Sequence, residues 1–91
     1  MKKVCSILTE GKKVYDIYEE GKKLFTKIDN TFFEIEGFAS LRIHPKLVNE
    51  LAPSEIKKYS ISKKIEPRRY MIINISKNKW IGTSKIEKII E

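Results

Sequence analysis

The sequence predicts a small α+β domain that is mainly β: a curled antiparallel β-meander or partial barrel with short helices, including a C-terminal helix. Two observations predict the meander. Residues 1–30 consist of three copies of a ten-residue unit, each with a Lys pair followed by a short apolar run. The units are joined at Glu10-Gly11-Lys12 and Glu20-Gly21-Lys22, and glycine supplies the positive φ that tight hairpin turns demand.

The expected strands of the first half cover residues 3–9, 12–19, 22–28 and 31–36, with Gly37 allowing a bulge or turn into 38–44. Period-two alternation then places one apolar set on a common face: Tyr15, Ile17, Leu24, Ile28, Phe33, Ile35, Leu41 and Ile43. The opposite face carries charged residues together with Val14, Tyr18, Phe25, Phe32 and Phe38. Since neither face is purely polar, we expect strong curling or a second cover.

Short helices are expected after this meander. Pro45 suits the first turn of a helix over 46–51, a second helical turn is expected over 53–58, and 59–62 alternates like a strand. Residues 69–76 are apolar on both faces, which predicts a central strand.

A third observation predicts the C-terminal helix. After a basic turn at 77–79, the sequence Ser84-Lys85-Ile86-Glu87 has the spacing of a capping box. Ile86, Ile89 and Ile90 would then form one apolar helix face that covers the sheet.

Length and composition indicate one folded domain. Ninety-one residues suffice for a single modest core, and 41% hydrophobic with 34% charged residues is typical of a globular protein. No apolar run approaches the roughly 18–20 residues of a transmembrane helix, so no membrane partner is expected. The lone Cys5 suits a reducing cytoplasm. Abundant Ile and Lys with no Gln are typical of either a hot or an AT-rich source.

The net charge of +7 is concentrated in the second half. Residues 1–56 hold nine basic and nine acidic residues, whereas 57–91 hold ten basic and three acidic ones. A basic half beside a neutral half is typical of proteins with a polyanionic partner. Lys and Arg neutralise phosphates, and aromatic rings stack on unpaired bases. The candidate nucleic-acid-binding residues are therefore Lys63, Lys64, Arg68, Arg69, Tyr70, Lys77 and Lys79.

Two functions are compatible with this charge. The first is a small non-catalytic protein that binds DNA or RNA through the phosphate backbone, without sequence specificity. The alternative is a protein-interaction module, an inhibitor or regulator that docks an acidic surface of a partner protein. A homodimer formed through an exposed sheet edge is a further option. The Lys pairs of the repeated units are expected to be solvated charges at the rim of the sheet.

The sequence lacks the residues of common catalytic and metal sites. His44 is the only histidine and Cys5 the only cysteine, so no His- or Cys-based zinc site is expected. Neither a Gly-rich phosphate loop nor a Gly-x-Ser-x-Gly nucleophile motif is present. We therefore expect no enzyme activity, no cofactor and no metal.

Leu41-Arg42-Ile43-His44-Pro45 and the following residues to Leu51 resemble the strand-to-helix transition of two DNA-binding families, the ribbon-helix-helix repressors and the swapped-hairpin regulators of antitoxin type. The resemblance covers eleven of the ninety-one residues. It departs from the ribbon-helix-helix pattern because 59–65 alternates like a strand where a long second helix should follow. No residue role is transferred from it.

Overall fold

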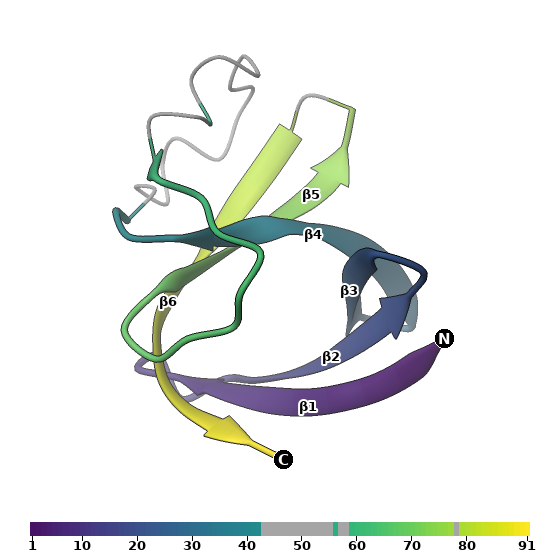
Figure 1. Ribbon diagram of the computed structural model, residues 1–91, viewed down its shortest axis with the longest axis horizontal. Helices are drawn as coiled ribbons and strands as arrows, with labels where there is room; N and C mark the ends of the chain where they lie inside the picture. Colours follow the sequence, from purple (N-terminus) through teal and green to yellow (C-terminus); the bar gives the residue numbers. More distant parts are fainter. Residues whose placement is uncertain (43–55, 57–58, 78) are drawn as a thin grey trace.

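The computed structural model describes residues 1–42, 56, 59–77 and 79–91, and these contain a closed antiparallel barrel of six strands (Figure 1). Each strand pairs with the next along the chain, and the last returns to pair with the first. The strands are β1 (Lys2–Thr9), β2 (Val14–Glu20), β3 (Lys23–Ile28), β4 (Thr31–Ala39), β5 (Tyr70–Ser76) and β6 (Lys79–Ile90).

The predicted meander of the first four strands is confirmed. Its turns contain the residues with positive φ that tight reversals need, namely Lys12, Gly21, Asp29 and Asn30. Gly21 has the expected left-handed conformation, with φ of 62°. At the first turn it is Lys12 that has this conformation, with φ of 63°, while Gly11 lies against the Ser84 hydroxyl.

The predicted C-terminal helix is wrong, because residues 79–90 form β6. The apolar spacing that suggested a helix is produced by a β-bulge. Leu8 pairs with Lys88 and Thr9 with Ile86, so Glu87 is an extra residue in β6. The bulge lets Ile86 and Ile89, three positions apart, both pack with the barrel core while Glu87 and Lys88 are exposed.

The α+β class is therefore corrected: the described residues form an all-β barrel whose elements are all strands. The helices expected over 46–51 and 53–58 lie outside the described residues, apart from Ile56. No helix of the described ranges combines the length and the apolar character needed to cross a membrane.

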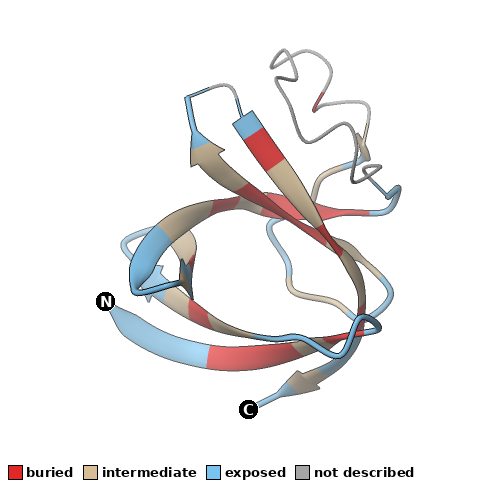
Figure 2. Cartoon of the chain, turned by 180° about the vertical axis from the view of Figure 1, so that it is seen from behind, coloured by how far each residue is buried: buried red, intermediate tan, exposed pale blue. Residues whose placement is uncertain are grey.

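The main core fills the barrel, and Figure 2 shows the buried segments that line it. Its buried members come from five strands: Cys5, Ile7, Ile17, Ile35, Phe38, Met71, Ile73 and Ile86. Tyr15, Leu24, Ile28 and Phe33 pack against this cluster, so the predicted apolar face is confirmed for β2 to β4. Leu41 was expected on that face but is 56% exposed, and Ile43 lies outside the described residues.

Phe38 lies in the core although it was expected on the opposite face. Ile35 pairs with Ile73 but Gly37 pairs with Ile72, so Glu36 is an extra residue in β4. The sequence allowed a bulge or a turn at Gly37; the structure has a bulge there, with Glu36 as the extra residue, and it reverses the alternation for the rest of the strand. The Phe38 side chain is fully buried as a result.

A second core covers the outer face of β4, β5 and β6. It contains Ala39, Ile56, Ile72 and Trp80, with Tyr59 and Ile61 packed against them. Because Ile72 lies in this cluster while Met71 and Ile73 lie in the first, β5 is buried on both faces, as predicted for a central strand.

The segment 59–69 crosses the barrel beside β4 before β5 begins (Figure 1). Residues 59–62 were expected to form a strand, but only Ser62 pairs, through one isolated bridge to Phe38. Phe38 and Ser62 exchange two backbone hydrogen bonds of 2.7 and 2.9 Å, and Ser40 N donates to Tyr59 O at 3.2 Å.

Candidate nucleic-acid interface

The structure divides the seven predicted residues between the two ends of β5. Lys63, Lys64, Arg68 and Arg69 precede Tyr70, at which β5 begins, whereas Lys77 and Lys79 lie at the turn after Ser76. A strand of seven residues spans about 20 Å, so these are two separate surfaces rather than one short track.

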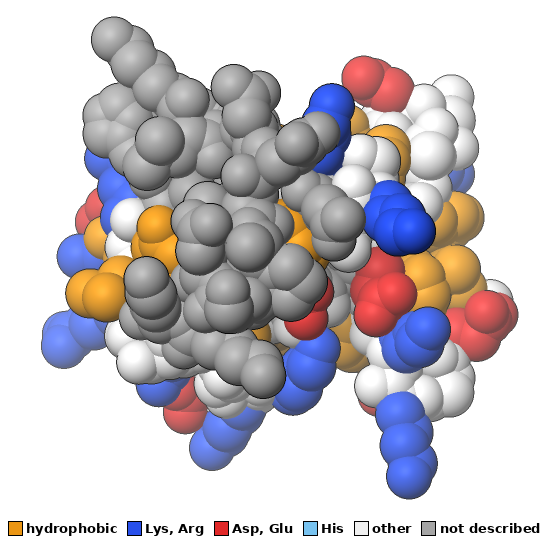
Figure 3. All heavy atoms as spheres, turned by 90° about the horizontal axis from the view of Figure 1, so that it is seen from above, with side chains coloured by type: hydrophobic (Ala, Val, Ile, Leu, Met, Phe, Trp, Pro, Cys, Tyr) orange, Lys and Arg blue, Asp and Glu red, His pale blue; other side chains and the backbone are white. Residues whose placement is uncertain are grey.

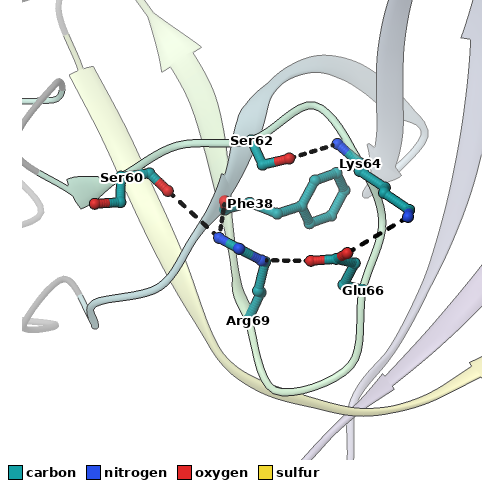
Figure 4. A network of polar contacts seen from close by, with 6 residues as sticks. All are labelled: Phe38, Ser60, Ser62, Lys64, Glu66 and Arg69. Atoms are coloured by element: carbon teal, nitrogen blue, oxygen red, sulfur yellow. Dashed lines mark hydrogen bonds and ion pairs between the residues drawn. The ribbon is translucent and has the colours of Figure 1, made fainter.

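Arg69 holds the 59–69 segment against β4 (Figure 4). Its Nε donates to Glu66 Oε2 at 2.8 Å, and its Nη1 donates to the carbonyl oxygens of Phe38 and Ser60 at 3.5 and 3.4 Å. The hydrogen bond from Arg69 lowers the pKa of the Glu66 carboxyl, with the nearby positive charges adding to the effect. These contacts give the guanidinium a structural role in positioning its neighbours.

Arg68 and Arg69 are therefore expected to respond differently to mutation. Arg69→Ala should lower the free energy of unfolding by about 1–3 kcal/mol, because hydrogen bonds that involve charged groups contribute about that much. Arg68→Ala, at an exposed neighbouring position, should change it by less than about 0.5 kcal/mol. Urea titrations of both variants measure the difference. Equal effects would show that the Arg69 contacts do not hold this segment.

Lys63 and Lys64 are exposed and paired with acids. The Lys64 ammonium is 3.7 Å from Glu66 Oε1, and Lys63 Nζ is 3.9 Å from Glu36 Oε2 and also donates to Glu36 O. Glu36 Oε1 in turn accepts a hydrogen bond of 3.0 Å from Trp80 Nε1. Exposed ion pairs contribute little to stability, so both ammonium groups can exchange a carboxylate for a phosphate at low cost.

Arg68 also belongs to a second group of basic residues, which come from β6 and from the segments on both sides of it. Arg68 N donates to Ile86 O and Ile86 N donates to Arg69 O, each at 2.8 Å. From the β1–β2 turn, Glu10 N donates to Lys85 O at 2.8 Å and Gly11 N donates to Ser84 Oγ at 2.9 Å. Three distant parts of the sequence thus meet at the middle of β6. We name their cations the basic junction: Lys12, Lys13, Arg68 and Lys85.

The cations of the basic junction are only partly neutralised. Lys12 Nζ lies 3.3 Å from Glu87 Oε2, but its side chain is 75% exposed. Within the described residues, Lys13, Arg68 and Lys85 form no ion pair. The Lys85 ammonium lies 6.0 Å from the centre of the Tyr70 ring, so the one aromatic candidate of the predicted site is beside a cation.

Sequence reasoning missed Lys12, Lys13 and Lys85 as members of this site. The Lys12-Lys13 pair was visible in the repeated units, but only the closure of β1 against β6 brings it to the same strand as Arg68. Outside the basic junction, basic and acidic side chains are mixed on the surface that Figure 3 shows. In the view from above, Lys and Arg side chains are scattered over the described surface with Asp and Glu side chains among them (Figure 3).

In comparisons with known proteins, no family model matches the chain, and no curated protein or solved structure is significantly similar to it. The local resemblance over 41–51 to DNA-binding repressors falls mainly outside the described residues, since only Leu41 and Arg42 are described, both exposed. In the described ranges, no group of three or more His, Cys, Asp or Glu is placed to hold a metal ion. Function is therefore inferred from surface chemistry.

Proposed function

We propose that the protein is a small non-catalytic nucleic-acid-binding protein that contacts the phosphate backbone through the basic junction. The observation that supports this most strongly is that backbone hydrogen bonds bring three separate segments together at β6. These segments contain four cationic residues, three of them without an acidic partner among the described residues. Such a cluster attracts a polyanion and releases its counterions. Because the single cysteine is unpaired and buried, a cytoplasmic location is part of the proposal.

The predicted residues have different roles in this proposal. Arg68 contacts phosphate together with Lys85, and Lys63 and Lys64 extend the contact after exchanging their acidic partners. The Lys85 ammonium lies over the Tyr70 ring, so this ring stacks on a base after Lys85 turns to a phosphate. Arg69 positions the segment. Lys77 and Lys79 lie at the other end of β5, so only a polynucleotide long enough to span β5 contacts them together with Arg68.

The test is the salt dependence of binding to a labelled polynucleotide. The logarithm of the affinity of the wild type should fall steeply with the logarithm of the salt concentration. Arg68→Ala with Lys85→Ala should flatten that slope by about two units, about one for each phosphate contact. The measurement is fluorescence anisotropy on two unrelated sequences, which should be affected equally.

The matched control is Lys2→Ala with Lys22→Ala, the same loss of charge on two exposed lysines elsewhere. Lys12 and Lys13 cannot serve as a control, because they belong to the basic junction. If both double variants behave alike, only net charge matters and the basic junction is not a site. If the wild type binds no DNA or RNA at any salt, docking on an acidic protein surface is the better function. The homodimer stays a prediction.

A further inference from the structure

Although the barrel is closed, β2 and β3 separate at one end and leave an opening in its wall. Their ladder of paired residues runs from Glu20↔Lys23 to Ile17↔Thr26, although β2 begins at Val14 and β3 ends at Ile28. At the point where the ladder ends, the Thr26 hydroxyl donates to the carbonyl oxygen of Asp16 at 2.9 Å. The Thr26 side chain thus takes the place of the next backbone hydrogen bond between β2 and β3.

Both strands remain fixed on their other sides. Val14 and Tyr15 are paired with β1, through Leu8 and Ile7. Lys27 and Ile28 are paired with β4. The opening therefore lies between two strands that are fixed by their pairing with β1 and β4. No strand has to move to form it.

A cavity of about 370 Å³ lies in this opening. Its lining is mainly apolar, with Val14 and Tyr15 from β2, Ile28 from β3 and Ile81 from β6. Tyr15, Ile28 and Ile81 also pack against the main core, which fixes their positions. A tyrosine hydroxyl is neutral at physiological pH, and burial raises the pKa of Tyr15 further. The two remaining lining residues, Lys13 and Lys27, are cations.

The aromatic ring of Phe32 lies next to Lys27, a lining residue of this cavity, and the ring of Tyr18 lies next to Phe32. The Lys27 ammonium lies 5.5 Å from the centre of the Phe32 ring. Phe32 in turn meets Tyr18 edge to face, with ring centres 5.0 Å apart. Phe32 is 40% exposed and Val14 58% exposed, so one exposed apolar side chain contacts Lys27 and another lines the same cavity as Lys27.

We propose that the opening between β2 and β3 binds one unpaired base of a single-stranded nucleic acid, with Lys13 and Lys27 contacting the flanking phosphates and Phe32 stacking on the next base. This inference rests on the proposed function and deepens it. A nucleotide has apolar base faces beside a phosphate, which matches an apolar cavity with two cations among its lining residues. A duplex keeps its bases inside the stack and cannot offer one without unpairing. Lys13 is a member of the basic junction and also lines the cavity, so the two sites adjoin.

The experiment compares an oligothymidylate of about ten nucleotides, within the site size of small single-strand binders, with a duplex of equal length. The wild type should bind the single strand at least about tenfold more tightly. Val14→Glu places an anion beside the cavity at an exposed position and should remove most of that preference. Val4→Glu is the matched control, because Val4 is also an exposed valine, 38% accessible, on β1.

Two further variants keep the test independent of any folding defect in Val14→Glu. Lys27→Ala and Phe32→Ala, both at exposed positions, should each weaken single-strand binding about tenfold and leave duplex binding nearly unchanged. Equal affinity of the wild type for single strand and duplex, with Val14→Glu no different from Val4→Glu, would overturn the base site but leave the proposed function standing. Absence of binding to either polymer would instead refute the proposed function.

Discussion

Replacing Gly37 by alanine should lower the free energy of unfolding by about 3 kcal/mol, as overpacking of a tight contact does. A Cβ atom at this position would lie 2.8 Å from the carbonyl oxygen of Ser62 and would also collide with the Ile61 side chain. Ser62 cannot retreat without breaking the two backbone hydrogen bonds that it shares with Phe38. The segment that holds Lys63, Lys64 and Arg69 would therefore be displaced.

Gly21→Ala is the control for this change. Gly21 has a φ of 62°, but nothing lies within 4 Å of the position that a Cβ would take. Alanine there should cost about 1 kcal/mol, the price of a left-handed conformation alone. Urea denaturation of both variants measures the difference. A cost at Gly37 no greater than at Gly21 would mean that the 59–69 segment does not pack on β4 as described.

Ile73→Ala should cost about 2–5 kcal/mol, as truncation of a buried isoleucine does. Ile73 is fully buried and pairs with Ile35 on β4 and Ile81 on β6, and all three side chains belong to or pack against the main core. The cavity left by the lost atoms could not close without shifting both neighbours. Ile90→Ala, at a position that is 41% exposed, should change stability by less than about 0.5 kcal/mol. Similar melting temperatures for both variants would contradict the central position of β5.

The first four strands were predictable because their information is local. Each of the three repeated units contains one strand, the turn residues lie between the units, and Asp29-Asn30 form the turn before the fourth strand. The errors lie where a bulge changes the alternation. Glu87 gives β6 the apolar spacing of a helix, and Glu36 turns Phe38 from the outer face into the core. Gly37 signals a possible bulge in β4, but which residue is extra depends on the partner strand, so period-two or capping patterns in one segment do not reveal how the alternation changes.

The candidate site was predictable in part for the same reason. Lys63 to Tyr70 are neighbours in sequence and remain close in space, but β5 separates them from Lys77 and Lys79. Lys85 joins Arg68 because β5 pairs with β6, and Lys12 and Lys13 join them only because β1 closes against β6. The opening between β2 and β3 depends on the Thr26 side chain, which a strand pattern treats as an ordinary β-former.

The most direct test of the proposed interface is a titration of isotope-labelled protein with oligothymidylate at low salt, followed by two-dimensional amide NMR spectra. The proposed interface predicts that the changing amides cluster at residues 12–15, 27–28, 32, 63–64, 68–70 and 84–85, and that the β2–β3 turn at 20–23 is unaffected. Raising the salt concentration should reverse the changes. An unchanged spectrum at low salt, or changes centred on residues 20–23, would contradict the account.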